Sequence, residues 1–253
     1  MLVIMHSEHV KLTGVQFKDA PGWTVRIGDC ENVWVDGISI LNNPLVPNSD
    51  GIHVTISRNV RISNCHIVAG DDAIIASGFG DEINIDNASY GTQKKTYING
   101  NKTGNAENIV VSNCVLSSKS AGIRIGYGRG NVRNSIFSNI VIYNSNRGIL
   151  INTRERGNVD NIIFDNLMIE TAHIGGTWWG RGEPIHISSM PIYKDTANGT
   201  IKNISFKNIH IKSETGIVVW ASELGKVSNL SFDNVRVVVK NSDRIAQFGG
   251  NID

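Results

Sequence analysis

The chain has 253 residues, of which 40% are hydrophobic and 19% are charged, and its formal net charge is +1. These values allow one large domain with a sizeable core, and they argue against wholesale disorder, a nucleic-acid partner and a polybasic membrane surface. The sequence has no run of about 18 apolar residues, so it predicts no helix that spans a bilayer.

One sequence frame recurs from near the start of the chain to near its end. Each copy has the pattern Asn, apolar, spacer, apolar, small or polar spacer, Asn or Gly, apolar, spacer, apolar. The copies begin at His9, Asn32, Asn59, Asn108, Asn134, Asn161, Asn203 and Asn229. The steps between these starts are 23, 27, 49, 26, 27, 42 and 26 residues, so two steps carry inserts. A period of this length is typical of a solenoid.

A second segment with alternating apolar residues accompanies each copy, for example WTVRI from Trp23, DGIHV from Asp50 and AGIRI from Ala121. A period of two residues is typical of strands. We therefore predict an all-β protein, a parallel β-helix of about eight coils that forms a single domain over 1–253. The two inserts lie at about 78–107 and 170–200.

Stacked coils give the repeated residues structural roles. The repeat places six asparagines at one position, where we predict a turn ladder in left-handed backbone geometry: Asn64, Asn113, Asn139, Asn166, Asn208 and Asn234. Cys65 and Cys114 also share one position, and we predict that both are buried free thiols.

Acidic residues interrupt this pattern on two consecutive coils. Asp50 begins one second segment, and Asp71 and Asp72 begin the next. Aligning DGIHV with DAIIA places Asp50 and Asp72 in one column, so three carboxylates gather within one or two strand spacings. Crowded like charges raise at least one pKa, which suits general acid and base catalysis. A Ca²⁺ site and simple turn formation are the alternatives for these residues.

The segments that carry these acids, PNSDGIHV and GDDAI, resemble the first two signatures of glycoside hydrolase family 28, the polygalacturonase family. The resemblance implies a right-handed parallel β-helix that hydrolyses glycosidic bonds of a pectin-like polysaccharide or oligosaccharide with inversion. It also implies that Asp71 is the general acid, that Asp50 and Asp72 activate water, and that Asn48 orients the site. A separation of one strand spacing, ~5 Å between carboxylates, would instead favour retention.

Two further signatures of that family differ in this chain. Its Gly-His-Gly stretch is Ser-Ala-Gly here, with Ala121 at the histidine position. Its Arg-Ile-Lys stretch has Leu150 and Asn152 at the two basic positions. These differences question a standard galacturonate chain as the substrate without removing the three acids.

Other residues are candidates for holding a sugar. Strand alignment places Arg26, His53, Arg124 and His186 in the outward column of Leu150, and Arg124 can bind a carboxylate in bidentate fashion. The alternative for Arg124 is a solvated surface arginine. Asn152 and Arg154 follow nearby. The second insert contributes three more candidates: Trp178, Trp179 and Arg181. The tryptophan pair suits sugar stacking or, equally, a hydrophobic cap. Inserts that close the cleft would favour cleavage at chain ends.

Two other functions are compatible with the same residues. One is a Ca²⁺-dependent β-helix polysaccharide lyase, with the three aspartates as ligands and Arg124 as the base. The other is a non-catalytic carbohydrate-binding β-helix, which Ala121, Leu150 and Asn152 favour. Under the hydrolase hypothesis we expect neither a cofactor nor a metal.

The beginning of the chain raises the question of what covers the first coil. An open β-helix end exposes apolar core and strand edges, so we expect further coils, a cap or an oligomer partner there. The segment MLVIM is too short for the apolar core of a signal peptide. The family resemblance implies a secreted or periplasmic enzyme.

Overall fold

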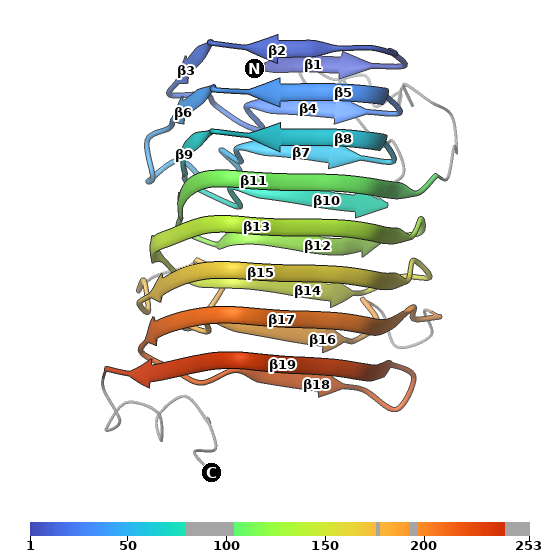
Figure 1. Ribbon diagram of the computed structural model, residues 1–253, viewed down its shortest axis with the longest axis vertical. Coiled ribbons are helices and arrows are strands. Elements are labelled where there is room, and N and C mark those ends of the chain that lie inside the picture. The colour runs from blue at the N-terminus through green and yellow to red at the C-terminus, as the bar shows by residue number, and fades with distance from the viewer. Residues whose placement is uncertain (79–103, 176–177, 193–196, 241–253) are drawn as a thin grey trace, which may run out of the picture.

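The repeats fold into two long parallel sheets that stack coil upon coil in the computed structural model. The structure describes residues 1–78, 104–175, 178–192 and 197–240. Within this part of the chain every regular element is a strand, and no helix is long and apolar enough to span a bilayer. Figure 1 shows β1 and β2 at one end of the stack and β18 and β19 at the other.

Sheet A has eight strands in the order β1-β4-β7-β10-β12-β14-β16-β18, so each coil contributes one strand. These strands are the alternating segments that follow the repeat frame. Their bounds are β1 (Leu2–Met5), β4 (Val25–Gly28), β7 (Ile52–Thr55), β10 (Ile74–Gly78), β12 (Ala121–Gly128), β14 (Arg147–Thr153), β16 (Ile185–Ser189) and β18 (Val218–Ala221).

Sheet B has eleven strands and contains the repeat frame itself. The first three coils contribute two short strands each: β2 (Lys11–Thr13) with β3 (Gln16–Lys18), β5 (Glu31–Asp36) with β6 (Ser39–Leu41), and β8 (Arg58–Ser63) with β9 (His66–Ala69). Later coils contribute one long, bent strand each: β11 (Ala106–Ser118), β13 (Val132–Ser145), β15 (Val159–Thr171), β17 (Thr200–Ser213) and β19 (Lys226–Val239).

The core lies between the two sheets and consists of stacked apolar side chains. Phe137, Phe164 and Phe206 show this directly, because successive ring centroids are 5.2 and 5.1 Å apart, and the stack continues over 4.8 Å to Phe232, which is exposed on the last coil. These separations match the spacing of neighbouring strands, about 4.8 Å, so equivalent residues lie above one another. The prediction of stacked coils is confirmed, and Cys65 and Cys114 are both buried free thiols.

The repeated asparagines form the predicted turn ladder. All six have φ between 52° and 57°, which is the left-handed region that Asn tolerates better than most residues. The Nδ2 of Asn166 donates to Oδ1 of Asn139 over 2.8 Å, and the Nδ2 of Asn139 donates to Oδ1 of Asn113 over 3.3 Å. These amides therefore tie successive coils together at the bend of sheet B.

Candidate active site

The three acids lie where two neighbouring strands of sheet A begin. Asp50 lies two residues before β7, and Asp72 lies two residues before β10. Ile52 pairs with Ile74 in parallel register, which places Asp50 level with Asp72 on adjacent coils. The alignment of the two acids, predicted from the sequence, is confirmed.

Two glycines allow the coils to approach closely beside these acids. A Cβ added at Gly51 would lie 2.2 Å from the carbonyl oxygen of Ala73, and one at Gly70 would lie 2.3 Å from that of Val46. Any larger residue would force the backbones apart. The Asp-Gly and Gly-Asp-Asp sequences therefore serve packing as well as chemistry.

The three carboxyl groups are buried and act on one another. Asp50 is 3% exposed, Asp71 is 7% exposed and Asp72 is 3% exposed. Burial and the nearby charge of Asp72 raise the pKa of Asp50 to about 8. Burial and the charges of Asp72 and Asp50 raise the pKa of Asp71 to about 7. The cluster therefore holds at least one proton in neutral solution, which a general acid requires.

Asp72 is held by donors from the next coil. The backbone N–H of Ala121 donates to its Oδ1 over 3.0 Å, and Nε of Arg124 lies 3.0 Å from its Oδ2. The backbone hydrogen bond and the ion pair fix the orientation of the Asp72 carboxyl group. Asp71 lies beside it, and its Oδ1 accepts the N–H of Asp72 over 2.9 Å.

His53 connects Asp50 with Arg124. Its Nε2 lies 3.2 Å from Oδ2 of Asp50 and 3.3 Å from Nη2 of Arg124. Burial, with Arg124 nearby, lowers the pKa of His53 well below its usual value, so the ring is neutral. A neutral ring can accept a hydrogen bond at Nε2 from the guanidinium or from protonated Asp50. Trp23 stacks on the imidazole at a centroid distance of 3.8 Å.

The outward column predicted from strand alignment is present. Register pairs join Arg26, His53, Ile75, Arg124, Leu150 and His186 across six strands of sheet A. The column is mixed, because Leu150 is buried and Ile75 is fully covered. Arg26 is buried as well, with its guanidinium 5.4 Å from the ring centroid of Trp23.

The remaining candidates near the acids differ in their surroundings. Asn48 is exposed, with a φ of 56° that fits the turn before β7. Asn152 and Arg154 lie at the end of β14, and each has a buried polar atom, Oδ1 and Nε respectively, without a hydrogen-bond partner among the described residues. The guanidinium of Arg154 is 5.6 Å from the ring centroid of Tyr127.

The second insert forms a separate charged cluster around Glu183, level with β14 and β16. Nδ1 of His186 lies 3.3 Å from Oε1 of Glu183, and Nε of Arg147 lies 3.3 Å from its Oε2. Although burial raises the pKa of Glu183, the bonds from His186 and Arg147 outweigh burial and lower it to about 2. The backbone N–H of Arg181 also donates to Glu183, over 2.5 Å.

The insert tryptophans lie beside this cluster and not beside the acids. Trp179 is exposed, and its carbonyl oxygen accepts a hydrogen bond of 2.9 Å from Nδ2 of the buried Asn146. Trp178 is half-buried. Two strands, β12 and β14, separate β10 from β16 in sheet A, so His186, Trp178, Trp179 and Arg181 lie about three strand spacings, ~14 Å, along the sheet.

Sequence reasoning missed four residues of these clusters: Trp23, Tyr127, Arg147 and Glu183. The strand alignment contained a signal for three of them: Trp23, Arg147 and Glu183, the last of which is level with Arg147 by the pairing of Ile149 with Ile185. Register pairing continues the Asp50–Asp72 column through Ala121 and Arg147, because Ala121 pairs with Arg147 directly. Trp23 lies level with Asp50 by the pairing of Val25 with Ile52.

Most of the first insert, 79–103, lies outside the described residues, so its expected closure over the cleft has no structural description. Within the described part of the chain, no three His, Cys, Asp or Glu side chains form a group that could hold a metal ion.

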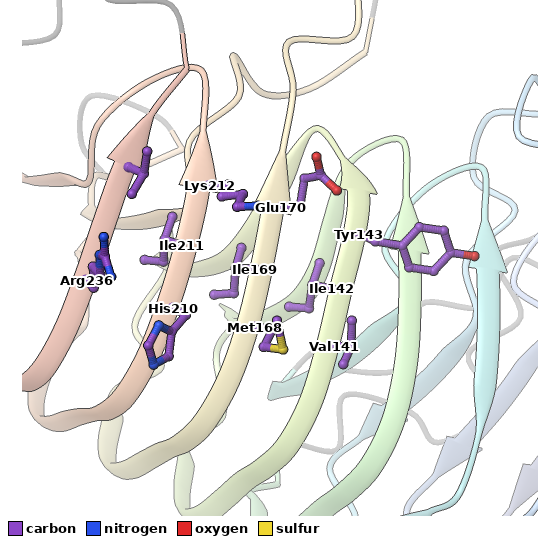
Figure 2. A pocket seen from close by; sticks show the side chains of 11 residues that line it. Val141, Ile142, Tyr143, Met168, Ile169, Glu170, His210, Ile211, Lys212 and Arg236 are labelled. Atoms are coloured by element: carbon purple, nitrogen blue, oxygen red, sulfur yellow. The ribbon is translucent and has the colours of Figure 1, made fainter.

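Sheet B carries a groove of a different kind. The groove B, as we call it, has a volume of about 350 Å³ and lies on β13, β15, β17 and β19 (Figure 2). Its floor is a register column of Val141, Met168, His210 and Arg236. Figure 2 also shows Tyr143, Glu170 and Lys212 at its edge.

Comparison with protein families gives one match over most of the chain. A profile described as Glycosyl hydrolases family 28 matches residues 1–159. A probable polygalacturonase of Vitis vinifera is 31% identical over 98 residues, which are 39% of this chain and 19% of that protein. A polygalacturonase of Medicago sativa is 31% identical over 116 residues, which are 44% of this chain and 28% of that protein. The matched segments are thus less than a third of these relatives' lengths.

The fold also has counterparts among solved structures. An endo-xylogalacturonan hydrolase from Aspergillus tubingensis superposes with a TM-score of 0.68 at 15% identity, and the match covers 94% of this chain and 61% of that one. This likeness confirms the right-handed parallel β-helix.

Proposed function

The chain belongs to glycosyl hydrolases family 28, and on that premise we propose that it hydrolyses glycosidic bonds of a pectin-like, acidic polysaccharide or oligosaccharide. One observation carries the proposal. Asp50, Asp71 and Asp72 are buried together on adjacent coils, and burial, with the charges of the neighbouring aspartates, raises the pKa values of Asp50 and Asp71 to about 8 and about 7. Buried, coupled acids in this arrangement are costly for stability, so a catalytic role accounts for them best.

Asp71 is the proposed general acid. Its raised pKa leaves it substantially protonated near neutral pH, so it can protonate the leaving glycosidic oxygen. Asp72 is the proposed base, because the N–H of Ala121 donates to its Oδ1 and the positive charge of Arg124 lies beside its Oδ2. Asp72 and Asp50 hold the attacking water, and Asp72 accepts its proton as the C–O bond breaks.

We propose that the reaction inverts the anomeric carbon, as the resemblance to the family implies. Inversion requires the water to attack the face opposite the leaving group, with one carboxyl on each side of the sugar. Proton NMR of the first-formed anomer tests this point. A product that keeps the configuration of the substrate would contradict inversion and assign one aspartate as a nucleophile.

The basic residues at the site support an acidic substrate. Arg124 is 21% exposed beside Asp72, and a guanidinium binds a carboxylate in bidentate fashion. Arg124 could thus bind the substrate carboxylate. The family's two basic residues cannot do so in this chain, because Leu150 and Asn152 stand at their positions. Trp178, Trp179, Arg181 and His186 would contact a sugar farther along sheet A.

The decisive assay is reducing-end release from a panel of plant and microbial polysaccharides by the wild type, Asp71→Asn and Glu170→Gln. The proposal expects release by the wild type and by Glu170→Gln, whose carboxylate lies in groove B and pairs with Lys240. Asp71→Asn should bind the same polysaccharide without cleaving it. Equal release by wild type and Asp71→Asn would refute the assigned general acid.

A non-catalytic sugar-binding function is the second candidate, and two observations favour it. Ala121 is fully buried and Leu150 is 7% exposed, so apolar side chains occupy two positions where the family signatures are polar. Binding by the wild type without any product would support this function. A product that absorbs in the ultraviolet and depends on Ca²⁺ would instead indicate a lyase.

A further inference from the structure

The end of β12 has an unusual backbone. Gly126, Tyr127 and Gly128 have φ values of 99°, 70° and 98°, so three successive residues lie in the positive-φ region. Among the described non-glycine residues with positive φ, all others except Ile56 are Asn, Asp or His. A bulky aromatic residue adopts this conformation at a free-energy cost, and such strain is concentrated at functional sites.

Packing against the next coil fixes this backbone in place. A Cβ at Gly126 would lie 2.1 Å from the carbonyl oxygen of Asn152, so only glycine fits there. The register between β10 and β12 also shifts between Ala76 and Gly78, which is opposite the same segment. The irregular backbone therefore orients the side chain of Tyr127 differently from a side chain in a regular strand.

The Tyr127 ring lies close to two positive side chains. The guanidinium carbon of Arg124 is 5.7 Å from the ring centroid, and that of Arg154 is 5.6 Å from it. Arg124 comes from β12 and Arg154 from the residue after β14, so two coils supply them. The negative face of an aromatic ring attracts cations, so the Tyr127 ring favours the placement of both guanidinium groups near it.

Two buried polar atoms at the end of β14 have no hydrogen-bond partner in the described part of the chain. Nε of Arg154 and Oδ1 of Asn152 are both buried and unbonded there. Arg124 faces Asp72 on one side, yet its side chain keeps 21% exposure. Buried polar atoms without partners require an explanation. A bound anionic ligand would supply the missing acceptor for the positively charged donor.

We infer that Tyr127 is a positioning residue that orients Arg124 and Arg154, one from each of two coils, as a subsite for carboxylate groups of the substrate, next to the bond that the three aspartates cleave. This inference rests on the proposed function and names residues for its acidic-substrate selectivity. Carboxylates of the substrate accept hydrogen bonds from these guanidinium groups, while the Asn152 oxygen accepts from a neighbouring sugar hydroxyl.

The test compares Tyr127→Gly, Tyr127→Phe and the matched ring-loss control Tyr143→Gly on sheet B. Each variant is assayed with trigalacturonate and with the same trimer after its carboxyl groups are reduced to alcohols. For Tyr127→Gly we expect KM for trigalacturonate to rise on the order of tenfold, with kcat within about twofold and no change in KM for the reduced trimer. Tyr127→Phe should restore the wild-type values, and Tyr143→Gly should leave them unchanged.

Thermal unfolding separates positioning from a purely structural role. Tyr127→Gly removes the unfavourable φ of a non-glycine residue, so its melting temperature should equal or exceed that of the wild type. A lower melting temperature with an equal rise in KM for both trimers would overturn the inference. If the wild type cleaves neither trimer, titration calorimetry still decides, because Tyr127→Gly must weaken binding of trigalacturonate alone. Equal binding by the two proteins would overturn the subsite independently of hydrolysis.

Discussion

Ionisable side chains are buried on sheet A of the solenoid and exposed in groove B on sheet B. The sheet A site buries Asp50 and His53 to 3% and 1% exposure. Groove B instead leaves His210, Glu170, Lys212 and Arg236 exposed around apolar side chains such as Met168 (Figure 2). Both faces are built from the same repeat, so the difference comes from particular side chains and not from the fold.

The difference separates a site of chemistry from an ordinary strand surface. Burial on sheet A changes pKa values and strengthens the interactions between charges, whereas water screens exposed charges. The volume of a groove alone therefore does not identify a catalytic site, because groove B has no buried acid among its lining residues. Substitutions of the same chemical type on the two faces make this contrast testable.

The largest contrast is expected for activity. Asp71→Asn removes the proposed proton donor and should lower kcat by about 10²- to 10⁴-fold. Glu170→Gln makes the equivalent change in groove B and should leave kcat unchanged. Initial rates of reducing-end release give both numbers. Similar losses of kcat in the two variants would show that the two faces do not differ in their role in catalysis.

Stability should respond to pH on sheet A in a definite direction. The pKa of Asp50 is about 8 in the folded protein and about 3.9 in an unfolded chain. Its contribution to stability is therefore fully present below about pH 4 and is lost as the pH rises toward 8. Asp50→Asn avoids this loss and should raise the free energy of unfolding by about 2–4 kcal/mol at pH 8.5, with little effect at pH 4.

Urea unfolding at several pH values measures this dependence. Glu170→Gln is the control, because its carboxylate is exposed and should produce no comparable slope. A destabilised Asp50→Asn protein at pH 8.5 would show that the buried carboxyl is ionised and stabilising, contrary to the burial argument.

Arg124 should set the alkaline limit of activity. Its charge lowers the pKa of both Asp50 and Asp71, against the larger effect of burial. In Arg124→Gln both values should rise, so the alkaline limb of kcat/KM should move up by about one pH unit. The matched variant Arg236→Gln in groove B should keep the wild-type profile. An unchanged pH profile in Arg124→Gln would show that the charge of this arginine does not affect the pKa values of the acids.

The smallest effect is expected for the apolar part of groove B. Met168 is 61% exposed, so Met168→Gln removes little buried surface. The free energy of unfolding should change by less than about 0.5 kcal/mol, with activity retained. A larger loss measured by urea unfolding would mean that this surface is covered in solution.

Sequence reasoning located the acids because the repeat supplied an internal alignment. Asp50 and Asp72 stand out as carboxylates in a column of the repeat, and the parallel register confirms that they are level. Tyr127 gave no such signal, because its role depends on a backbone irregularity beside Gly126 that no periodicity contains. Glu183 lies in that same column of the repeat, level with Arg147 by the pairing of Ile149 with Ile185, but its contacts with Arg147 and His186 are visible only in the folded chain.

The amino-acid sequence by itself determined the solenoid, the asparagine turns and the position of three acids on adjacent coils. These features repeat at fixed intervals, and strand spacing then follows from backbone hydrogen bonding. Only the tertiary structure decided that Arg124 reaches Asp72, that Trp23 stacks on His53, and that Tyr127 lies near two arginines. Such contacts join residues up to 71 positions apart in the chain, as His53 and Arg124 show. Their geometry depends on how irregular turns direct side chains, which a repeat pattern does not encode.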